Sequence, residues 1–151
     1  MTTTVARLDD FHDLVGQQIG YTEWQPITQE RVNVFADATD DHQWIHVDPE
    51  RARGGPFGGP IAHGYLTLSL IPALIHQVLE VEGMKFGVNY GCNKVRFPAP
   101  VPVGSNLRLG VSVAEVEPVN DGVQVVMDMT LETEGSTKPS CVAQVVYRYY
   151  A

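Results

Sequence analysis

The sequence predicts an α+β protein in which an antiparallel sheet wraps around one long central helix. Residues 63–79 form an apolar stretch of helical length without a charged side chain, and the second half of the chain changes to the two-residue alternation of β-strands. The chain has 151 residues, which is enough for one domain with a core and too few for two. We therefore expect a single domain over residues 1–151.

The first predicted helix covers residues 28–38. Thr28 is a suitable N-cap, and Glu30 places a negative charge in the first turn, where the helix dipole favours it. Ile27 is spaced to pack against Val32 across the helix start. These signals together define where the helix begins.

Residues 39–60 predict a long irregular excursion. They are polar, contain many Gly and Pro residues, and follow neither the helical nor the strand period. Connections of this length in a compact domain are usually functional or disordered, and Trp44, Ile45 and Phe57 give this one apolar side chains to pack. We therefore expect an ordered loop with a function.

The apolar stretch predicts a helix that other structure encloses, because it is apolar around its whole circumference. Pro72 removes the amide that would bond to the carbonyl of Leu68, so a kink is expected there. Gly83 is the expected end of the helix. Residues 61–79 approach membrane-spanning length, but they include His, Thr, Ser, Pro and Gln, so we expect burial in protein and no membrane.

The second half predicts a meander of three antiparallel strands. Apolar side chains alternate with polar or small ones in three segments, residues 107–113, 123–131 and 141–149. Asn-Asp-Gly at 120–122 predicts the first hairpin turn, and Glu-Gly-Ser at 134–136 predicts the second. An earlier strand over residues 84–97 changes its apolar parity, which predicts a β-bulge near residues 91–94.

The composition argues against several classes of function. The net charge of −8, with only ten Lys and Arg residues, argues against a nucleic-acid surface. Cys92 and Cys141 lack a C-x-x-C spacing and neighbouring His ligands, so they predict buried thiols in a reducing compartment. The first fifteen residues lack the basic start and apolar core of a secretory signal, so we expect a cytoplasmic protein.

The densest cluster of ionisable side chains lies at the start of the excursion. Three Asp and two His residues occur within nine positions: Asp40, Asp41, His42, His46 and Asp48. If the loop folds inward beside Trp44 and Ile45, these groups form a partly desolvated acid–base site. The alternative is a solvated polar loop in which an Asp caps a turn, and the spacing alone leaves both open.

Two motifs resemble those of a known family. The stretch FADATDDHQWIHVDP, followed by GGPIAHGYLTLSL, resembles the signature of the MaoC-like dehydratases, a hot-dog-fold family that includes the (R)-specific enoyl-CoA hydratases. The resemblance extends to NKVRFPAPVPVGSNL in the second half. It implies a hot-dog domain, a homodimer whose sheets join edge to edge, and reversible conversion of a trans-2-enoyl-CoA to the (R)-3-hydroxyacyl-CoA. Coenzyme A would then be part of the substrate, and we expect neither a cofactor nor a metal.

The resemblance also implies an acid–base pair. The family's hydratase motif has an Asp and then a His five residues later, and these positions fall on Asp41 and His46. The chain departs from the motif at two places, since Asp40 replaces the usual Gly and Gln43-Trp44 replaces the usual Asn-Pro. Repulsion from Asp40 would perturb the titration of Asp41.

The residues themselves support this chemistry. A carboxylate and an imidazole on the same water can take one proton and return another to C2 of the acyl chain, which suits Asp41 and His46. Charge develops on the thioester oxygen, and the helix that begins near His63 points free amides at such a group. We expect the Gly64 amide to be the donor, because a side chain there would block close approach.

Other residues are candidates for substrate binding. His63 either lines the site or caps and packs the helix start. Tyr65 and Ser69 face either an acyl tunnel or the core. Lys94 and Arg96 lie on one face of a strand, where they either meet the phosphates of coenzyme A or are simply solvated.

Three other functions fit parts of the sequence. A thioesterase would use a carboxylate-activated water and release free thiol, although the Asp-x4-His spacing beside the AHG helix start favours hydration. A metal enzyme would use Asp41, His42 and His46, but the sequence offers no clear further ligand and Pro49 lies just beyond. A non-catalytic acyl-thioester binder, similar to the nodulation-protein N-like members of the family, would explain Asp40 as a sign of lost catalysis.

Overall fold

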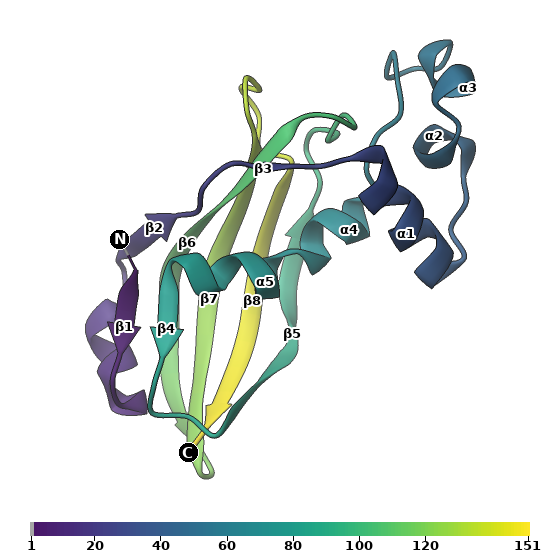
Figure 1. The fold of residues 1–151 in the computed structure, drawn as a ribbon. Coiled ribbons are helices and arrows are strands. Elements are labelled where there is room, and N and C mark those ends of the chain that lie inside the picture. Colours follow the sequence, from purple (N-terminus) through teal and green to yellow (C-terminus); the bar gives the residue numbers. More distant parts are fainter. Residues whose placement is uncertain (1) are drawn as a thin grey trace.

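A six-stranded antiparallel sheet dominates the computed structural model, which describes residues 2–151. Its strands run in the order β2-β6-β7-β8-β5, with β3 paired to β6 (Figure 1). The strands are β2 (Gln18–Tyr21), β3 (Gln25–Pro26), β5 (Phe86–Arg96), β6 (Asn106–Val119), β7 (Gly122–Thr133) and β8 (Cys141–Tyr150). A separate parallel pair consists of β1 (Thr3–Val5) and β4 (Leu79–Val81).

The helices are short and lie on one side of the sheet or at its upper end (Figure 1). They are η1 (Leu8–Leu14), α1 (Gln29–Thr39), α2 (Trp44–Val47), α3 (Pro49–Arg53), α4 (Gly64–Ser69), α5 (Ile71–Leu74) and η2 (Ile75–Gln77). The predicted α+β class is therefore confirmed. No helix within residues 2–151 is long and apolar enough to cross a membrane.

The predicted meander is confirmed as β6, β7 and β8. Val119 pairs with Gly122 across the first hairpin, where Asp121 has a positive φ of 62°. The predicted irregularity in β5 is also confirmed, as register shifts at Asn89/Gly91 and at Cys92/Lys94.

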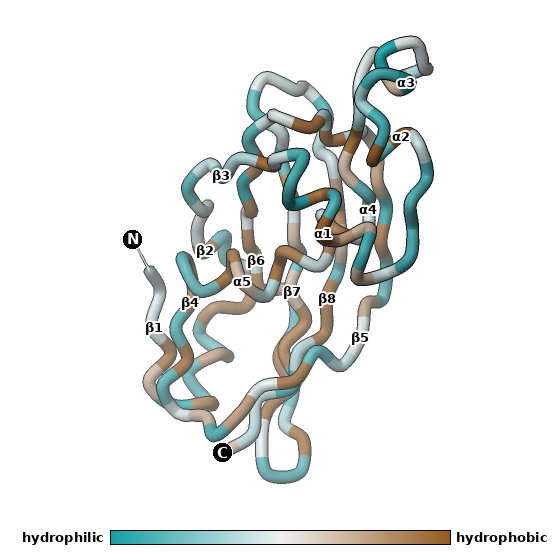
Figure 2. The backbone as a smooth tube through the Cα atoms, turned by 45° about the vertical axis from the view of Figure 1, so that its right-hand side comes forward, coloured by the Kyte–Doolittle hydropathy of each residue, from teal (hydrophilic) through white to brown (hydrophobic). Residues whose placement is uncertain are grey.

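The core lies between the sheet and the central helices. Alternate side chains of β6 and β7, such as Leu107 and Met129, are fully buried and form one cluster with Leu66 and Leu74. The hydrophobic colour in Figure 2 is accordingly concentrated along β6, β7 and β8. Burial of each such side chain stabilises the fold by about 1.5–3 kcal/mol relative to its exposure.

The central helix is shorter than the sequence predicts. Instead of running to Gly83, it consists of α4, α5 and η2 and ends at Gln77. The break between α4 and α5 is close to Pro72, which cannot donate the backbone hydrogen bond of a continuous helix. The chain then becomes extended because β4 pairs with β1.

The excursion over residues 39–60 is ordered, and its first half is more regular than expected. It contains α2 and α3, and the Asp48 side chain caps α3 by accepting a hydrogen bond from the Arg51 amide at 3.1 Å. Pro49 occupies the first turn of α3, where its missing amide costs nothing. The Arg51 guanidinium lies 4.4 Å from the Trp44 ring centroid, which ties α3 to α2.

Candidate active site

Asp41 is positioned by the end of α1. Thr28 caps the start of this helix, as expected, by accepting a hydrogen bond from the Arg31 amide. At the other end Asp40 adopts the left-handed conformation with φ of 58°. Glycine is the usual residue in this conformation, and Asp is among the few others that tolerate it. The backbone therefore explains both the family's Gly and its replacement by Asp40, without reference to catalysis.

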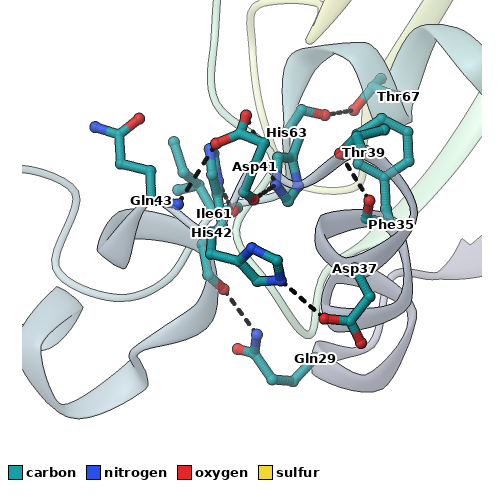
Figure 3. A network of polar contacts seen from close by, with 11 residues as sticks. Gln29, Phe35, Asp37, Thr39, Asp41, His42, Gln43, Ile61, His63 and Thr67 are labelled. Carbon is teal, nitrogen blue, oxygen red and sulfur yellow. Dashed lines mark hydrogen bonds and ion pairs between the residues drawn. The ribbon is translucent and has the colours of Figure 1, made fainter.

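His46 is presented by α2 with one ring nitrogen occupied and the other available. The side chain is buried, and Nδ1 lies 2.6 Å from the carbonyl oxygen of Ile61. Because a carbonyl only accepts, Nδ1 carries the hydrogen and Nε2 keeps its lone pair. The Gln29 side chain holds the backbone at this point by donating to the His46 carbonyl at 2.7 Å (Figure 3).

The surroundings of His46 favour its neutral form. Burial desolvates the ring and lowers its pKa below the ordinary value of 6.5. The hydrogen bond to Ile61 opposes this effect, His63 adds to it, and the nearby Asp41 opposes it. The lowered pKa leaves the Nε2 lone pair free to accept a proton at neutral pH.

Asp41, His46 and His63 converge at one point. One ring nitrogen from each His and one carboxylate oxygen of Asp41 all lie within 4.8 Å of one another. The two imidazole rings stack with centroids 3.8 Å apart, and His63 Nε2 lies 2.9 Å from the Asp41 carbonyl oxygen and 3.9 Å from its carboxylate. The Asp41 side chain is 52% exposed whereas His63 is buried, so the carboxylate forms the open side of the cluster.

The geometry of this cluster suits proton transfer better than metal binding. A tetrahedral metal needs ligand lone pairs that point at one centre, but the lone pairs of stacked rings lie in two nearly parallel planes and converge poorly. His46 Nδ1 and His63 Nε2 are also bound to carbonyl oxygens. His42, a member of the alternative metal set, instead bonds Asp37 of α1 at 2.8 Å (Figure 3).

Gly64 begins α4, next to this cluster. The first backbone hydrogen bond of this helix runs from the Thr67 amide to the His63 carbonyl, so the amides before Thr67 have no partner within the helix. A β-carbon on Gly64 would lie 3.1–3.2 Å from the Phe97 ring. Packing against Phe97 is thus a reason for glycine here that the sequence did not reveal.

Neither Tyr65 nor Ser69 belongs to the core. Tyr65 is 70% exposed and meets Phe97 edge-on, with ring centroids 6.1 Å apart. Ser69 is exposed, and its hydroxyl donates to the Tyr65 carbonyl at 2.6 Å. Ser69 also borders an apolar groove of about 270 Å³ between the central helices and the β5–β8 pair, lined by Leu68, Ile71, Pro72, Cys92 and Tyr147.

This groove has a continuation farther along the helices. A second groove of about 210 Å³ shares Pro72, Asn89 and Tyr147 with the first. It extends past Ile75 toward Tyr149. The two grooves together provide an elongated apolar surface that begins one to two helical turns from Gly64.

Lys94 and Arg96 lie on the other face of the sheet. They pair in register with Gln144 and Val142, whereas the alternate residues of β8, Ala143 and Val145, belong to the core cluster on the side of the helices. Lys94 and Arg96 are exposed and border a small pocket with Asp128. Within one chain they are therefore turned away from Asp41 and His46, and their binding of phosphates stays a prediction.

The sequence did not reveal the residues that support the pair from other elements. Gln29 reaches His46 across 17 positions of the chain, and Phe35 contacts the ring of His63 at a centroid distance of 4.9 Å. Both residues belong to α1, where their type and spacing are ordinary for a helix. No local signal marks either residue.

The chain resembles known proteins over most of its length. A family model described as "MaoC like domain" matches residues 10–135. The chain is 55% identical to 3-hydroxyacyl-thioester dehydratase Z of Mycobacterium tuberculosis (strain ATCC 25618 / H37Rv) over 98% of this chain and 99% of that protein. It is 42% identical to nodulation protein N of Rhizobium meliloti (strain 1021), over 90% of this chain and 86% of that protein.

A solved structure also resembles the fold. R-hydratase PhaJ1 from Pseudomonas aeruginosa, in its unliganded form, superimposes with a TM-score of 0.74 and 27% sequence identity. The match covers 90% of this chain and 81% of that one. The expected hot-dog arrangement of sheet and helices is therefore confirmed.

Proposed function

The chain belongs to the MaoC-like domain family, and we propose that it is a hydro-lyase that reversibly converts a trans-2-enoyl-CoA to the (R)-3-hydroxyacyl-CoA. The observation that carries the proposal is the convergence of the Asp41 carboxylate with a buried His46 whose Nε2 has a free lone pair. The start of α4 lies beside this pair, because His63 contacts both of its members. The names of two of these similar proteins, a dehydratase and a hydratase, support the same reaction.

The proposed reaction passes one proton through the pair. A water molecule donates one hydrogen bond to the Asp41 carboxylate and a second hydrogen bond to His46 Nε2. As the new C3–O bond forms, the pair accepts one of these protons and the C2–C3 π electrons move onto the thioester oxygen. The pair then returns a proton to C2, so no proton is gained or lost overall. Dehydration follows the same steps in reverse.

The negative charge on the thioester oxygen needs donors that are already in place. The amide of Gly64 is free of helical partners, and we assign it as the donor to this oxygen. The apolar grooves along α4, α5 and η2 are our candidate site for the acyl chain. Coenzyme A is part of the substrate in this proposal, and no metal or separate cofactor takes part.

We also propose that the protein acts as a homodimer. β5 is the last strand of the sheet, and within residues 2–151 it pairs only with β8, which leaves its other edge open. Its side chains are exposed almost throughout, including Phe86, Val88 and Tyr90. A long exposed apolar edge is typical of an interface, and a second copy joined edge to edge would cover it.

We propose that the protein is cytoplasmic. Cys92 and Cys141 are both free, which suits a reducing compartment. The expectation that both thiols are buried is wrong for Cys92, which is exposed on β5. Cys141 is buried, and burial raises the pKa of its thiol to about 11, so it is unreactive.

The test replaces Asp41 by Asn. Enoyl-CoA substrates of increasing length are followed by loss of enoyl absorbance and by release of free thiol. We expect turnover by the wild type without thiol release, and a decrease of about 10²–10⁴-fold in kcat for Asp41→Asn with substrate affinity retained. The matched control, Asp40→Asn, removes the same charge one residue earlier and should keep near wild-type turnover.

Other outcomes would contradict the proposal. Release of thiol by the wild type would identify a thioesterase. Binding of enoyl-CoA without turnover by any of the three proteins would identify a non-catalytic binder. Loss of activity after exhaustive chelation would support the alternative of a metal-dependent enzyme, which the stacked histidine rings do not favour.

A further inference from the structure

His63 contacts both members of the acid–base pair and is held on three sides. One face of its ring stacks on His46 at a centroid distance of 3.8 Å with 23° between the planes. Phe35 meets the ring at 4.9 Å and 59°. Nε2 donates to the Asp41 carbonyl oxygen at 2.9 Å, across 22 positions of the chain. The ring therefore has little freedom to move.

Packing alone does not explain a histidine at this position. His63 makes no side-chain hydrogen bond that caps α4, although it is the N-cap residue. It is only 3% exposed, and its Nδ1 has no hydrogen-bond partner within residues 2–151. An apolar side chain would fill the same space without leaving a buried nitrogen unpaired, which costs stability. The hydrogen bond from Nε2 to the Asp41 carbonyl is therefore the reason for a histidine at this position.

We propose that His63 is a positioning residue for hydration, which joins the backbone of Asp41, the ring of His46 and the start of α4 into one rigid unit. The inference rests on the proposed function above. Asp41 follows a left-handed residue at the end of a helix, and its side chain is half exposed. The Asp41 amide donates to the Ala36 carbonyl, and its carboxylate accepts from the Gln43 amide at 3.4 Å. The hydrogen bond from His63 to the Asp41 carbonyl adds a further anchor, on the side that faces His46.

The position of His63 in the sequence extends this effect to the oxyanion donor. His63 immediately precedes Gly64, so the residue that holds Asp41 and His46 also begins the helix whose amides face the thioester. A displacement of about 1 Å between such groups can slow a reaction about 10²-fold. Removal of the anchor should therefore lower kcat more than it changes KM.

The experiment compares two variants that separate the ring from the hydrogen bond. His63→Phe keeps a flat ring for stacking on His46 but has no donor for the Asp41 carbonyl. His63→Gln supplies an amide donor at a similar reach but has no ring. Both are compared with the wild type by urea unfolding, by kcat and KM for an enoyl-CoA, and by amide hydrogen exchange at residues 41–43.

We expect His63→Phe to unfold like the wild type, to lose about 10–100-fold in kcat with little change in KM, and to exchange faster at residues 41–43. His63→Gln should recover most of kcat and the slow exchange. Wild-type kcat in His63→Phe, or equal losses in the two variants, would overturn the inference. If the wild type has no hydratase activity, the proposed function fails, and equal exchange in all three proteins would separately show that His63 does not hold Asp41.

Discussion

His46 determines how the proposed reaction depends on pH, because only its neutral form offers a lone pair on Nε2. Burial lowers the pKa of this ring below 6.5, with smaller effects from Ile61, His63 and Asp41. We predict that kcat/KM stays high through pH 6.5 and falls only at lower pH. The measurement is a pH profile of kcat/KM beside an NMR titration of the ring.

The same shift predicts a loss of stability in acid. As pH falls from 6.5 toward the folded-state pKa, the unfolded chain binds a proton at His46 that the folded chain does not, so this residue's contribution to the free energy of unfolding decreases. His46→Gln should lack this contribution. If kcat/KM of the wild type already falls at or above pH 6.5, the His46 ring is not desolvated as the structure indicates.

Gly64 gives a second prediction for a single residue. An added β-carbon would lie 3.1–3.2 Å from the Phe97 ring, so Gly64→Ala forces that ring to move. In a double-mutant cycle with Phe97→Leu, measured by urea unfolding, we expect a coupling energy of about 1 kcal/mol. Additive effects would mean that Phe97 does not require glycine at this position.

At the scale of secondary structure, the end of α1 is the feature that places Asp41. Asp40 is left-handed, and a β-branched residue is strained in that conformation. We predict that Asp40→Val lowers the free energy of unfolding by about 1–2 kcal/mol, whereas Asp40→Gly does not lower it. Urea unfolding measures both variants.

The activity of the Asp40→Gly variant tests whether Asp40 affects catalysis. The backbone conformation accounts for this departure from the family's motif, so Asp40→Gly should keep the wild-type turnover. A large gain in turnover would instead show that Asp40 restrains catalysis, as the binder hypothesis required.

The short helices around the site depend on their surroundings. α2 and α4 contain four and six residues, which is too short for stability in isolation. They persist because α2 buries His46 against Ile61 and α4 buries Leu66 in the core. The functional elements are thus the ones that most need the rest of the fold.

At the scale of the whole molecule, the open edge of β5 leads to a prediction about assembly. Tyr90 is 58% exposed, and the Arg148 guanidinium lies 3.6 Å from its ring centroid. Tyr90→Glu keeps an attractive partner for Arg148 but puts a charge into the proposed interface. We expect the wild type to be a dimer and the variant a monomer by light scattering. A monomeric wild type would refute the edge-to-edge dimer.

Much of the fold was predictable from local patterns. The meander, the β5 irregularity and the start of α1 follow from alternation, turn residues and a cap, all of which act over a few positions. The break and early end of the central helix were harder to predict. Pro72 indicated a kink, but the end at Gln77 depends on the pairing of β4 with β1, whose partners are far apart in the chain.

The sequence by itself determined the family, the strand pattern and the loop that carries Asp41 and His46, because these depend on residue types and short-range periodicity. Only the tertiary structure decided that His63 joins that pair, that Gln29 supports it, and that Lys94 and Arg96 face the other way. These contacts join positions 17 and 22 residues apart or depend on register shifts in β5, and packing rather than local propensity selects among them.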